Sequence, residues 1–129
     1  MKKKIFITAL AISILIGEAA CFNPAVAAKT TRKQKKEASY LEVAAASFES
    51  KQYDTAIEYY TKAIELNPRN AETYTKRGNA KYLSGHFKDA IKDYTKALEI
   101  DPNRENNYYN RGIAKSNLKA YDEVIEDYT

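Results

Sequence analysis

Tyrosine, alanine and isoleucine recur at helical spacing between residues 53 and 64. Six positions share one side of a helix with 3.6 residues per turn: Tyr53, Ala56, Ile57, Tyr60, Ala63 and Ile64. The pattern returns further along the chain, starting at Phe87. A stripe of this kind predicts an amphipathic helix that buries one face against a neighbour.

After residue 36 the sequence pattern repeats every 34 residues, as the equivalent tyrosines Tyr40 and Tyr74 show. In that register it divides into the blocks 37–70, 71–104 and 105–129. The fourth place of the three blocks holds Tyr40, Tyr74 and Tyr108, and the eighth holds Ala44, Gly78 and Gly112. The seventeenth place holds Tyr53, Phe87 and Tyr121, and the twenty-fourth holds Tyr60, Tyr94 and Tyr128. A fixed period of this length predicts a stack of similar units that bury their apolar faces against one another. Most of the 11 tyrosines are therefore expected to be structural.

Turn signals divide the two complete blocks into two helices each. Pro68 and Pro102 end the second helix, because proline lacks a backbone donor and pushes the preceding residue out of helical geometry. Lys51-Gln52 and Gly85-His86 mark the inner turns. The sequence therefore predicts an all-α array of helical hairpins.

This arrangement resembles the tetratricopeptide repeat, and the resemblance covers everything after residue 36. Residues 71–103, AETYTKRGNAKYLSGHFKDAIKDYTKALEIDPN, match the family's aromatic, small and proline places at nearly every offset. The resemblance implies an α-solenoid that coils into a right-handed superhelix and binds a partner protein or peptide in its concave groove. Arg77 and Arg111 depart from the family, which usually has leucine there. We expect their stems to pack and their charged heads to reach solvent or a neighbouring carboxylate.

Residues 1–27 have the layout of a secretory signal peptide. Three lysines precede the apolar run 5–16, which is too short for the about 20 residues that a membrane crossing needs. Ala25-Val26-Ala27 offers small side chains for cleavage, so we expect export to the periplasm or beyond, with membrane contact only during export. Two alternatives are a lipoprotein acylated at Cys21, although Glu18 fits that motif poorly, and an uncleaved anchor.

Positive charge is concentrated ahead of the repeats. Residues 28–36 hold five lysines and arginines and are expected to form a basic, flexible linker. The repeats themselves, residues 37–129, carry 13 basic and 16 acidic side chains, a net charge of −3. We therefore expect no nucleic-acid partner; the alternative is that the linker tethers the protein to nucleic acid or an anionic membrane, which would make binding steeply salt-dependent.

Catalytic and metal-binding patterns are not found. His86, the only histidine, falls in an inner turn, and Cys21, the only cysteine, falls in the leader. The four glycines form no phosphate-binding loop. We expect no enzyme activity, no cofactor and no metal; the alternative is that these repeats are the targeting module of a longer enzyme.

Recognition is expected in the groove lined by the first helix of each block. The family's groove-facing places include Phe48 and Leu83, and they predict a mixed polar and aromatic partner-binding strip of Lys76, Asn79, Tyr82, Tyr109, Asn110 and Ile113. A solvated groove without a ligand is the plain alternative. The lysine and asparagine clamp with which some family members hold a carboxylate falls here on Leu41, Ala45, Lys76, Asn106 and Asn110, so the clamp is absent.

The third block, 105–129, stops soon after the twenty-fourth place. We expect the chain to be a fragment of a longer array, with a last helix of barely two turns that frays over residues 119–129. The face of Tyr121, Ile125 and Tyr128 would then be open to water and would favour self-association.

Overall fold

A computed structural model describes residues 23–128, with side chains described as far as residue 125. The apolar leader and Cys21 lie outside the described residues. The chain forms two compact units, residues 1–34 and 35–129. Helix α2, Pro24–Glu49, begins in the first unit, where its side chains are almost all exposed. None of the described helices combines the length and the apolar character that a membrane crossing requires.

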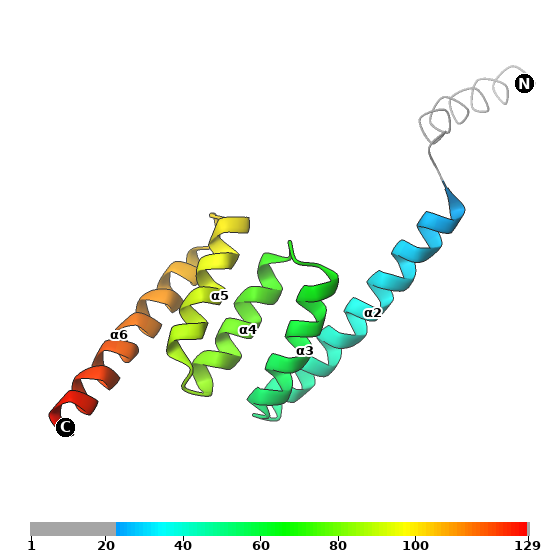
Figure 1. Cartoon of the computed structure of the whole chain (residues 1–129). Helices are drawn as coiled ribbons and strands as arrows, with labels where there is room; N and C mark the ends of the chain where they lie inside the picture. Colours follow the sequence, from blue (N-terminus) through cyan, green and yellow to red (C-terminus); the bar gives the residue numbers. More distant parts are fainter. Residues whose placement is uncertain (1–22, 129) are drawn as a thin grey trace, which may run out of the picture. The chain divides into compact units, whose positions relative to one another are not determined.

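The second unit is built of helices that pack on their neighbours in sequence. After α2 come α3 (Tyr53–Leu66), α4 (Ala71–Leu83), α5 (Phe87–Ile100) and α6 (Glu105–Tyr128), laid side by side in antiparallel order (Figure 1). The described residues contain no strand. The all-α solenoid of helical hairpins that the sequence predicted is therefore confirmed.

The two inner turns repeat the same geometry. Lys51 and Gly85, which hold the same place in successive blocks, both adopt positive φ, at 60° and 83°. In each turn the next backbone N–H returns to a carbonyl five residues earlier, from Gln52 to Ser47 and from His86 to Lys81, at 2.8 Å in both. This is the Schellman end of a helix, in which a left-handed residue lets the last carbonyls find donors.

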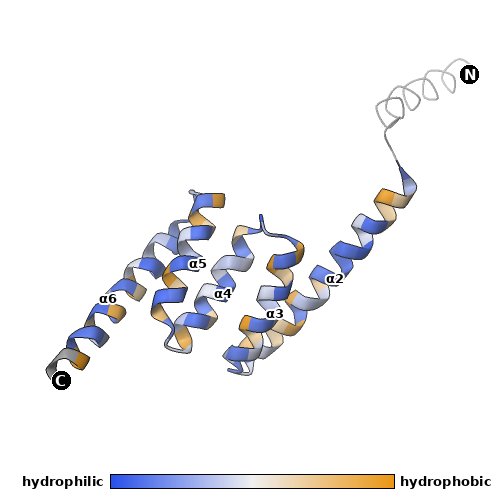
Figure 2. Cartoon of the chain, viewed as in Figure 1, coloured by the Kyte–Doolittle hydropathy of each residue, from blue (hydrophilic) through white to orange (hydrophobic). Residues whose placement is uncertain are grey.

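Three core clusters hold the helices together, and each joins three successive helices. The first contains Ala44, Ala56, Tyr60 and Ala80; the second Ile64, Ala71, Tyr74 and Ala97; the third Ala90, Tyr94 and Ala114, with Tyr82 and Ile91 packed against it. Along the helices, hydrophobic residues in orange are interspersed with hydrophilic residues in blue (Figure 2). Alanines allow close helix approach, and tyrosine rings fill the remaining space between blocks.

The structure corrects the prediction of a flexible linker at residues 28–36. These residues belong to helix α2, which starts with Pro24 at its first position and with Asn23 as its cap, the Ala25 N–H donating to Asn23 Oδ1 at 3.0 Å. Lysine, arginine, glutamine and alanine favour helix, and no glycine or proline interrupts them. The high charge density suggested a solvated coil, but the helix propensity of these residues determines the backbone conformation, which is helical.

The third block is also different from its prediction. A separate last helix of barely two turns was expected, but α6 runs without a break through residues 119–120. Lys119 stands at the place of Lys51 and Gly85, and a lysine in the left-handed region is strained. In the first block helix α3 packs back on α2 and offsets that strain, whereas residues 121–125 of α6 stay exposed.

Arg77 is the departure from the repeat pattern that the structure explains best. Its guanidinium binds the buried Asp93 with two hydrogen bonds, Nε to Oδ2 at 2.8 Å and Nη2 to Oδ1 at 2.7 Å, and also donates to Thr61 Oγ1 at 3.0 Å. Lys81 Nζ completes the cluster at 2.8 Å from Asp93 Oδ2. The expected carboxylate partner is therefore present, but the Arg77 head is nearly buried rather than in solvent, with 15% of the side chain exposed.

Candidate binding groove

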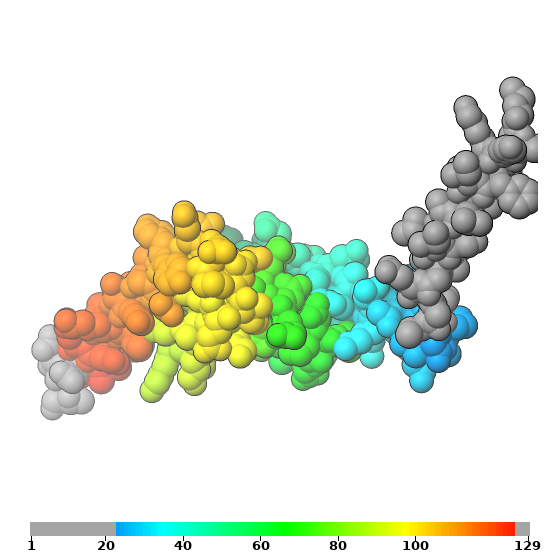
Figure 3. Space-filling model, turned by 90° about the horizontal axis from the view of Figure 1, so that it is seen from above, coloured from blue at the N-terminus to red at the C-terminus, as the bar shows by residue number. Residues whose placement is uncertain are grey.

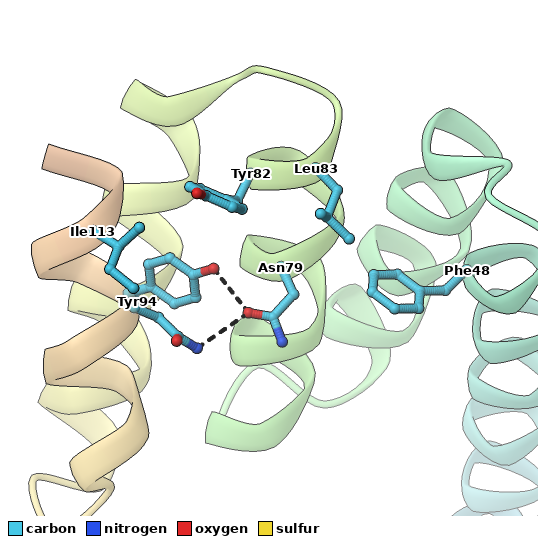
Figure 4. A pocket seen from close by; sticks show the side chains of 7 residues that line it. Phe48, Asn79, Tyr82, Leu83, Tyr94 and Ile113 are labelled. Atoms are coloured by element: carbon cyan, nitrogen blue, oxygen red, sulfur yellow. Dashed lines mark hydrogen bonds between the residues drawn. The ribbon is translucent and has the colours of Figure 1, made fainter. Parts of the chain in front are cut away.

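The first helices of the three blocks, α2, α4 and α6, line one depression of the second unit. Its lining includes four of the six predicted groove residues and three others: Asn79, Tyr82, Asn110 and Ile113, together with Phe48, Leu83 and Tyr94. Phe48 lies on the α2 side and Ile113 on the α6 side, with α4 between them (Figure 4). Residues far apart in sequence thus meet in one place because the hairpins repeat at a constant offset.

Asn79 is held at the middle of this depression. Its Oδ1 accepts from the Tyr94 hydroxyl at 2.8 Å and from Asn110 Nδ2 at 3.3 Å. The amide nitrogen points away from both of these partners (Figure 4), and among the described residues none accepts a hydrogen bond from it. The side chain therefore offers the groove a fixed donor.

Tyr94 lines the first depression, although the sequence analysis did not predict it as a groove residue. Its repeat place indicated a core role, which it has, and its hydroxyl nevertheless reaches the depression through Asn79. Burial, with smaller contributions from Tyr82 and Asp93, raises the pKa of Tyr94 to about 12. The hydroxyl consequently remains protonated and acts as a donor over the whole physiological range.

Tyr82 is part wall and part core. Its ring centroid lies 5.4 Å from that of Phe87, and its hydroxyl accepts from Asn117 Nδ2 at 2.6 Å. The sequence placed it in the recognition groove, since the repeat pattern does not demand an aromatic there. The structure adds a bridging role between α4 and α6.

A second depression adjoins the first along α2, α3 and α4. It is lined by Ala45, Phe48, Glu49, Tyr60, Lys76 and Asn79, so it shares Phe48 and Asn79 with the first. Lys76 Nζ pairs with Glu72 Oε1 at 2.9 Å, and this hydrogen bond lowers the pKa of the Glu72 carboxyl. The only lysine of the predicted strip is therefore already partly neutralised by its own helix.

Tyr109 is the predicted groove residue that the structure does not bring into either depression. Its side chain is 72% exposed, and it is absent from both linings. Phe48 and Leu83 take part instead, and both stood at groove-facing places of the repeat. Position within the repeat therefore predicted the lining of the groove correctly, whereas selecting residues of α6 because they are aromatic or polar was less reliable.

The lining has the chemistry of a peptide site. Across both depressions the only charged side chains are Glu49 and Lys76, and the rest are amides, phenols and apolar groups. Such a surface can hydrogen-bond a backbone and enclose an apolar side chain. Within the described residues, no group of three or more histidine, cysteine or carboxylate side chains is placed to hold a metal ion.

Comparison with known families agrees with this architecture. A model described as TPR repeat matches residues 45–85, and one described as tetratricopeptide repeat matches residues 71–104. Hsc70-interacting protein 1 of Drosophila melanogaster is 47% identical over 53 residues, which is 40% of this chain and 14% of the relative. The chain therefore spans only a small part of that relative's length.

Solved structures extend the likeness to most of the second unit. The Arabidopsis OM64 TPR domain is 33% identical with a TM-score of 0.65, covering 74% of this chain and 79% of that one. The TPR2B domain of yeast Sti1, solved in complex with an Hsp70 peptide, is 28% identical with a TM-score of 0.63 and covers 71% and 74% of the two chains. The first TPR of Spaghetti (RPAP3), solved with the HSP90 peptide SRMEEVD, is 29% identical with a TM-score of 0.62 and covers 73% and 76%.

Proposed function

Since this chain belongs to the tetratricopeptide repeat family, we propose that it acts as an exported scaffold that binds an extended, uncharged segment of a partner protein in the groove of α2, α4 and α6. The observation that carries this proposal is Asn79. Two hydrogen bonds fix its carbonyl end, so that the free amide hydrogens are presented to a ligand without further ordering.

The preferred ligand follows from the charge of the lining. A peptide carbonyl accepts from Asn79 Nδ2, and an apolar side chain fits between Phe48, Leu83 and Ile113. An acidic tail finds little to bind, because Lys76 is paired with Glu72 and the other clamp places hold Leu41, Ala45, Asn106 and Asn110. The relatives solved with chaperone peptides support peptide binding as the mode, while the side chains here favour a different peptide.

The test is selection from a displayed library of random peptides, followed by titration of the selected peptides in fluorescence anisotropy. We expect uncharged peptides with a central apolar residue. The labelled peptide SRMEEVD should show no saturable binding at micromolar concentration. Enrichment of acidic C-terminal peptides, or tight binding of SRMEEVD, would contradict the proposed specificity.

A single isosteric change isolates the donor. Asn79→Asp keeps an oxygen for the Tyr94 hydroxyl and for Asn110 but removes the Nδ2 donor, so the selected peptides should bind at least tenfold more weakly. Gln52→Glu makes the same amide-to-carboxylate change at an exposed side chain in the turn between α2 and α3 and lies outside both depressions. Equal affinity of the two variants would place the binding site elsewhere.

Export rests on the leader sequence. Intact-mass measurement of the exported protein should give a chain that starts at Ala28 and lacks Cys21. A mass corresponding to a lipidated Cys21, or to retained Met1, would replace this proposal with one of the membrane-anchored alternatives.

A further inference from the structure

Four residues of α4 recur unchanged at the same repeat places on α6, and their spacing puts each set on one face of its helix. On α4 this set holds helix α5. A Cβ added to Gly78 would lie 2.9 Å from Tyr94 Cε1, so the ring packs directly on the glycine. Arg77 and Lys81 both bind the Asp93 carboxylate, at 2.7 and 2.8 Å. The two sets are Tyr74, Arg77, Gly78 and Lys81 on α4, and Tyr108, Arg111, Gly112 and Lys115 on α6.

The set on α6, which we call the open face, holds no such helix among the described residues. A Cβ added to Gly112 would meet no atom within 4 Å, and Tyr108 is 50% exposed where the equivalent Tyr74 is 8% exposed. No carboxylate in the described part of the chain pairs with Arg111 or Lys115. Residues 119–125 continue α6 past α5 (Figures 1 and 3), so they do not fold back over the open face.

Arg111 is held in the same pose as Arg77, although its carboxylate partner is missing from the described residues. Its guanidinium donates to Thr95 Oγ1 at 3.2 Å. Arg77 donates in the same way to Thr61 Oγ1 at 3.0 Å, and each guanidinium carbon lies 5.6 Å from the centroid of the tyrosine one turn earlier. A group that is fixed before binding loses little freedom when it binds. The open face is therefore prepared for a carboxylate.

The repeat itself does not require these residue types. In the first block the places of the arginine, the glycine and the lysine hold Val43, Ala44 and Ser47, and α3 still packs on α2. Gly112 also weakens α6, because glycine is a poor helix former. A residue that opposes local structure without a packing role among the described residues is typical of a binding surface.

We propose that the open face is a second binding site, separate from the groove, for an amphipathic helix of a partner protein. This helix presents a carboxylate followed directly by an aromatic residue, as α5 presents Asp93 and Tyr94. The ring lies on Gly112, and the carboxylate pairs with Arg111 and Lys115. A second copy of this chain does not offer its own α5, because Asp93 and Tyr94 are buried there.

The probe is a capped, fluorescently labelled peptide with the sequence of α5, FKDAIKDYTKALEI, because this helix lies on the equivalent set in the structure. Anisotropy titration with the full chain should show saturable binding. Gly112→Leu fills the place of the ring and should weaken binding at least tenfold, while helicity is retained because a Cβ at residue 112 meets open space. Ala46→Leu on exposed α2 adds the same side chain as a control and should bind like the wild type. Equal binding by Gly112→Leu and wild type, or no binding by the wild type, would overturn the proposal.

A double-mutant cycle tests the pairing of the carboxylate. Asp93→Asn in the peptide and Arg111→Gln in the chain should each weaken binding at least fivefold. Combining them should weaken it little further, because both changes remove the same pair. Losses that multiply independently would overturn the assigned pairing.

Two further measurements separate this site from other occupants. An unlabelled peptide selected for the groove should not displace the α5 peptide, and displacement would place both ligands in one site and overturn the proposal. In sedimentation velocity without peptide, wild type and Gly112→Leu should behave alike. Self-association that Gly112→Leu abolishes would assign the open face to a second copy instead of a partner protein, and would also overturn the proposal.

Discussion

The environments of Arg77 and Arg111 illustrate how much a single carboxylate partner changes the contribution of a charged side chain to stability. Both side chains donate to a threonine, and both guanidinium carbons lie 5.6 Å from a tyrosine centroid. Among the described residues, only Arg77 has a buried carboxylate partner, Asp93. An ion pair of this kind is costly to break on one side, because the remaining charge stays desolvated.

We therefore predict that Arg77→Leu lowers the free energy of unfolding by about 2 kcal/mol, with Lys81 limiting the loss by keeping one partner at Asp93. Arg111→Leu should change it by less than about 0.5 kcal/mol, since no carboxylate within the described part of the chain pairs with this side chain. Urea denaturation followed by circular dichroism measures both. Equal losses would show that the Asp93 pair carries no net stability.

Asn107 should be a site where substitution stabilises the protein. Its side chain is 1% exposed, and among the described residues neither Nδ2 nor Oδ1 has a hydrogen-bond partner. Thr73, at the same register place, is buried as well and has a smaller polar group. Asn107→Thr should raise the free energy of unfolding by about 1 kcal/mol, because burying an unpaired amide costs about 1–3 kcal/mol. A lower melting temperature for this variant would show that the amide is satisfied in solution.

Tyr94 makes stability depend on alkaline pH. Its ordinary pKa is near 10, and burial raises the pKa to about 12 in the folded protein, so the unfolded chain loses this proton first. Stability should be complete below pH 10 and should fall between about pH 10 and 12. Tyr94→Phe should lose less stability across this window in urea titrations. Because burial also raises the pKa of Tyr60, part of the decrease in stability with rising pH should remain in the Tyr94→Phe variant.

Individual helices owe their positions to small residues at fixed places. Gly78→Ala places a methyl group 2.9 Å from the Tyr94 ring and should destabilise the protein by about 2 kcal/mol through overpacking. Gly112→Ala meets open space and should stabilise α6 by about 0.5–1 kcal/mol, because glycine is a poor helix former. Thermal unfolding at low protein concentration should shift the two melting temperatures in opposite directions. Equal shifts would mean that α6 is packed like α4.

Helix boundaries were predictable from sequence wherever packing and local signals agreed. Pro68, Pro102 and Gly85 mark real ends, and the repeat period located α3, α4 and α5. The separate last helix expected in the third block does not form, because a turn at Lys119 is stable only when the following helix packs back. Neither helix propensity nor periodicity contains that information for residues 121–128.

The groove was predictable as a place but not in its detail. Repeat register brought Asn79, Tyr82, Asn110 and Ile113 together as expected. The orientation of the Asn79 amide depends on the Tyr94 hydroxyl, which comes from the neighbouring helix. A contact between helices of this kind has no signature in local sequence, whereas the i,i+4 spacing of Glu72 and Lys76 is enough to predict their pairing.

The second unit as a whole should open from the end at α6. In a linear stack, each helix is stabilised only by its neighbours, so residues with fewer buried contacts exchange first. Amide hydrogens of residues 119–125 should exchange at least tenfold faster than those of residues 90–98 in monomeric protein at low concentration. Hydrogen exchange with mass spectrometry resolves the two segments. Equal protection in a monomer would require that the distal half of α6 has a partner within its own chain.

The overlapping arrangement of the three core clusters also has a mechanical consequence. Each cluster clamps three successive helices, so a load applied at the two ends of this unit passes through the clusters in series. Because clusters in series all carry the same force, the weakest terminal cluster gives way first, and the helices separate one hairpin at a time. The unit should therefore lengthen in steps under tension, with its terminal helices unfolding while its inner hairpins stay folded.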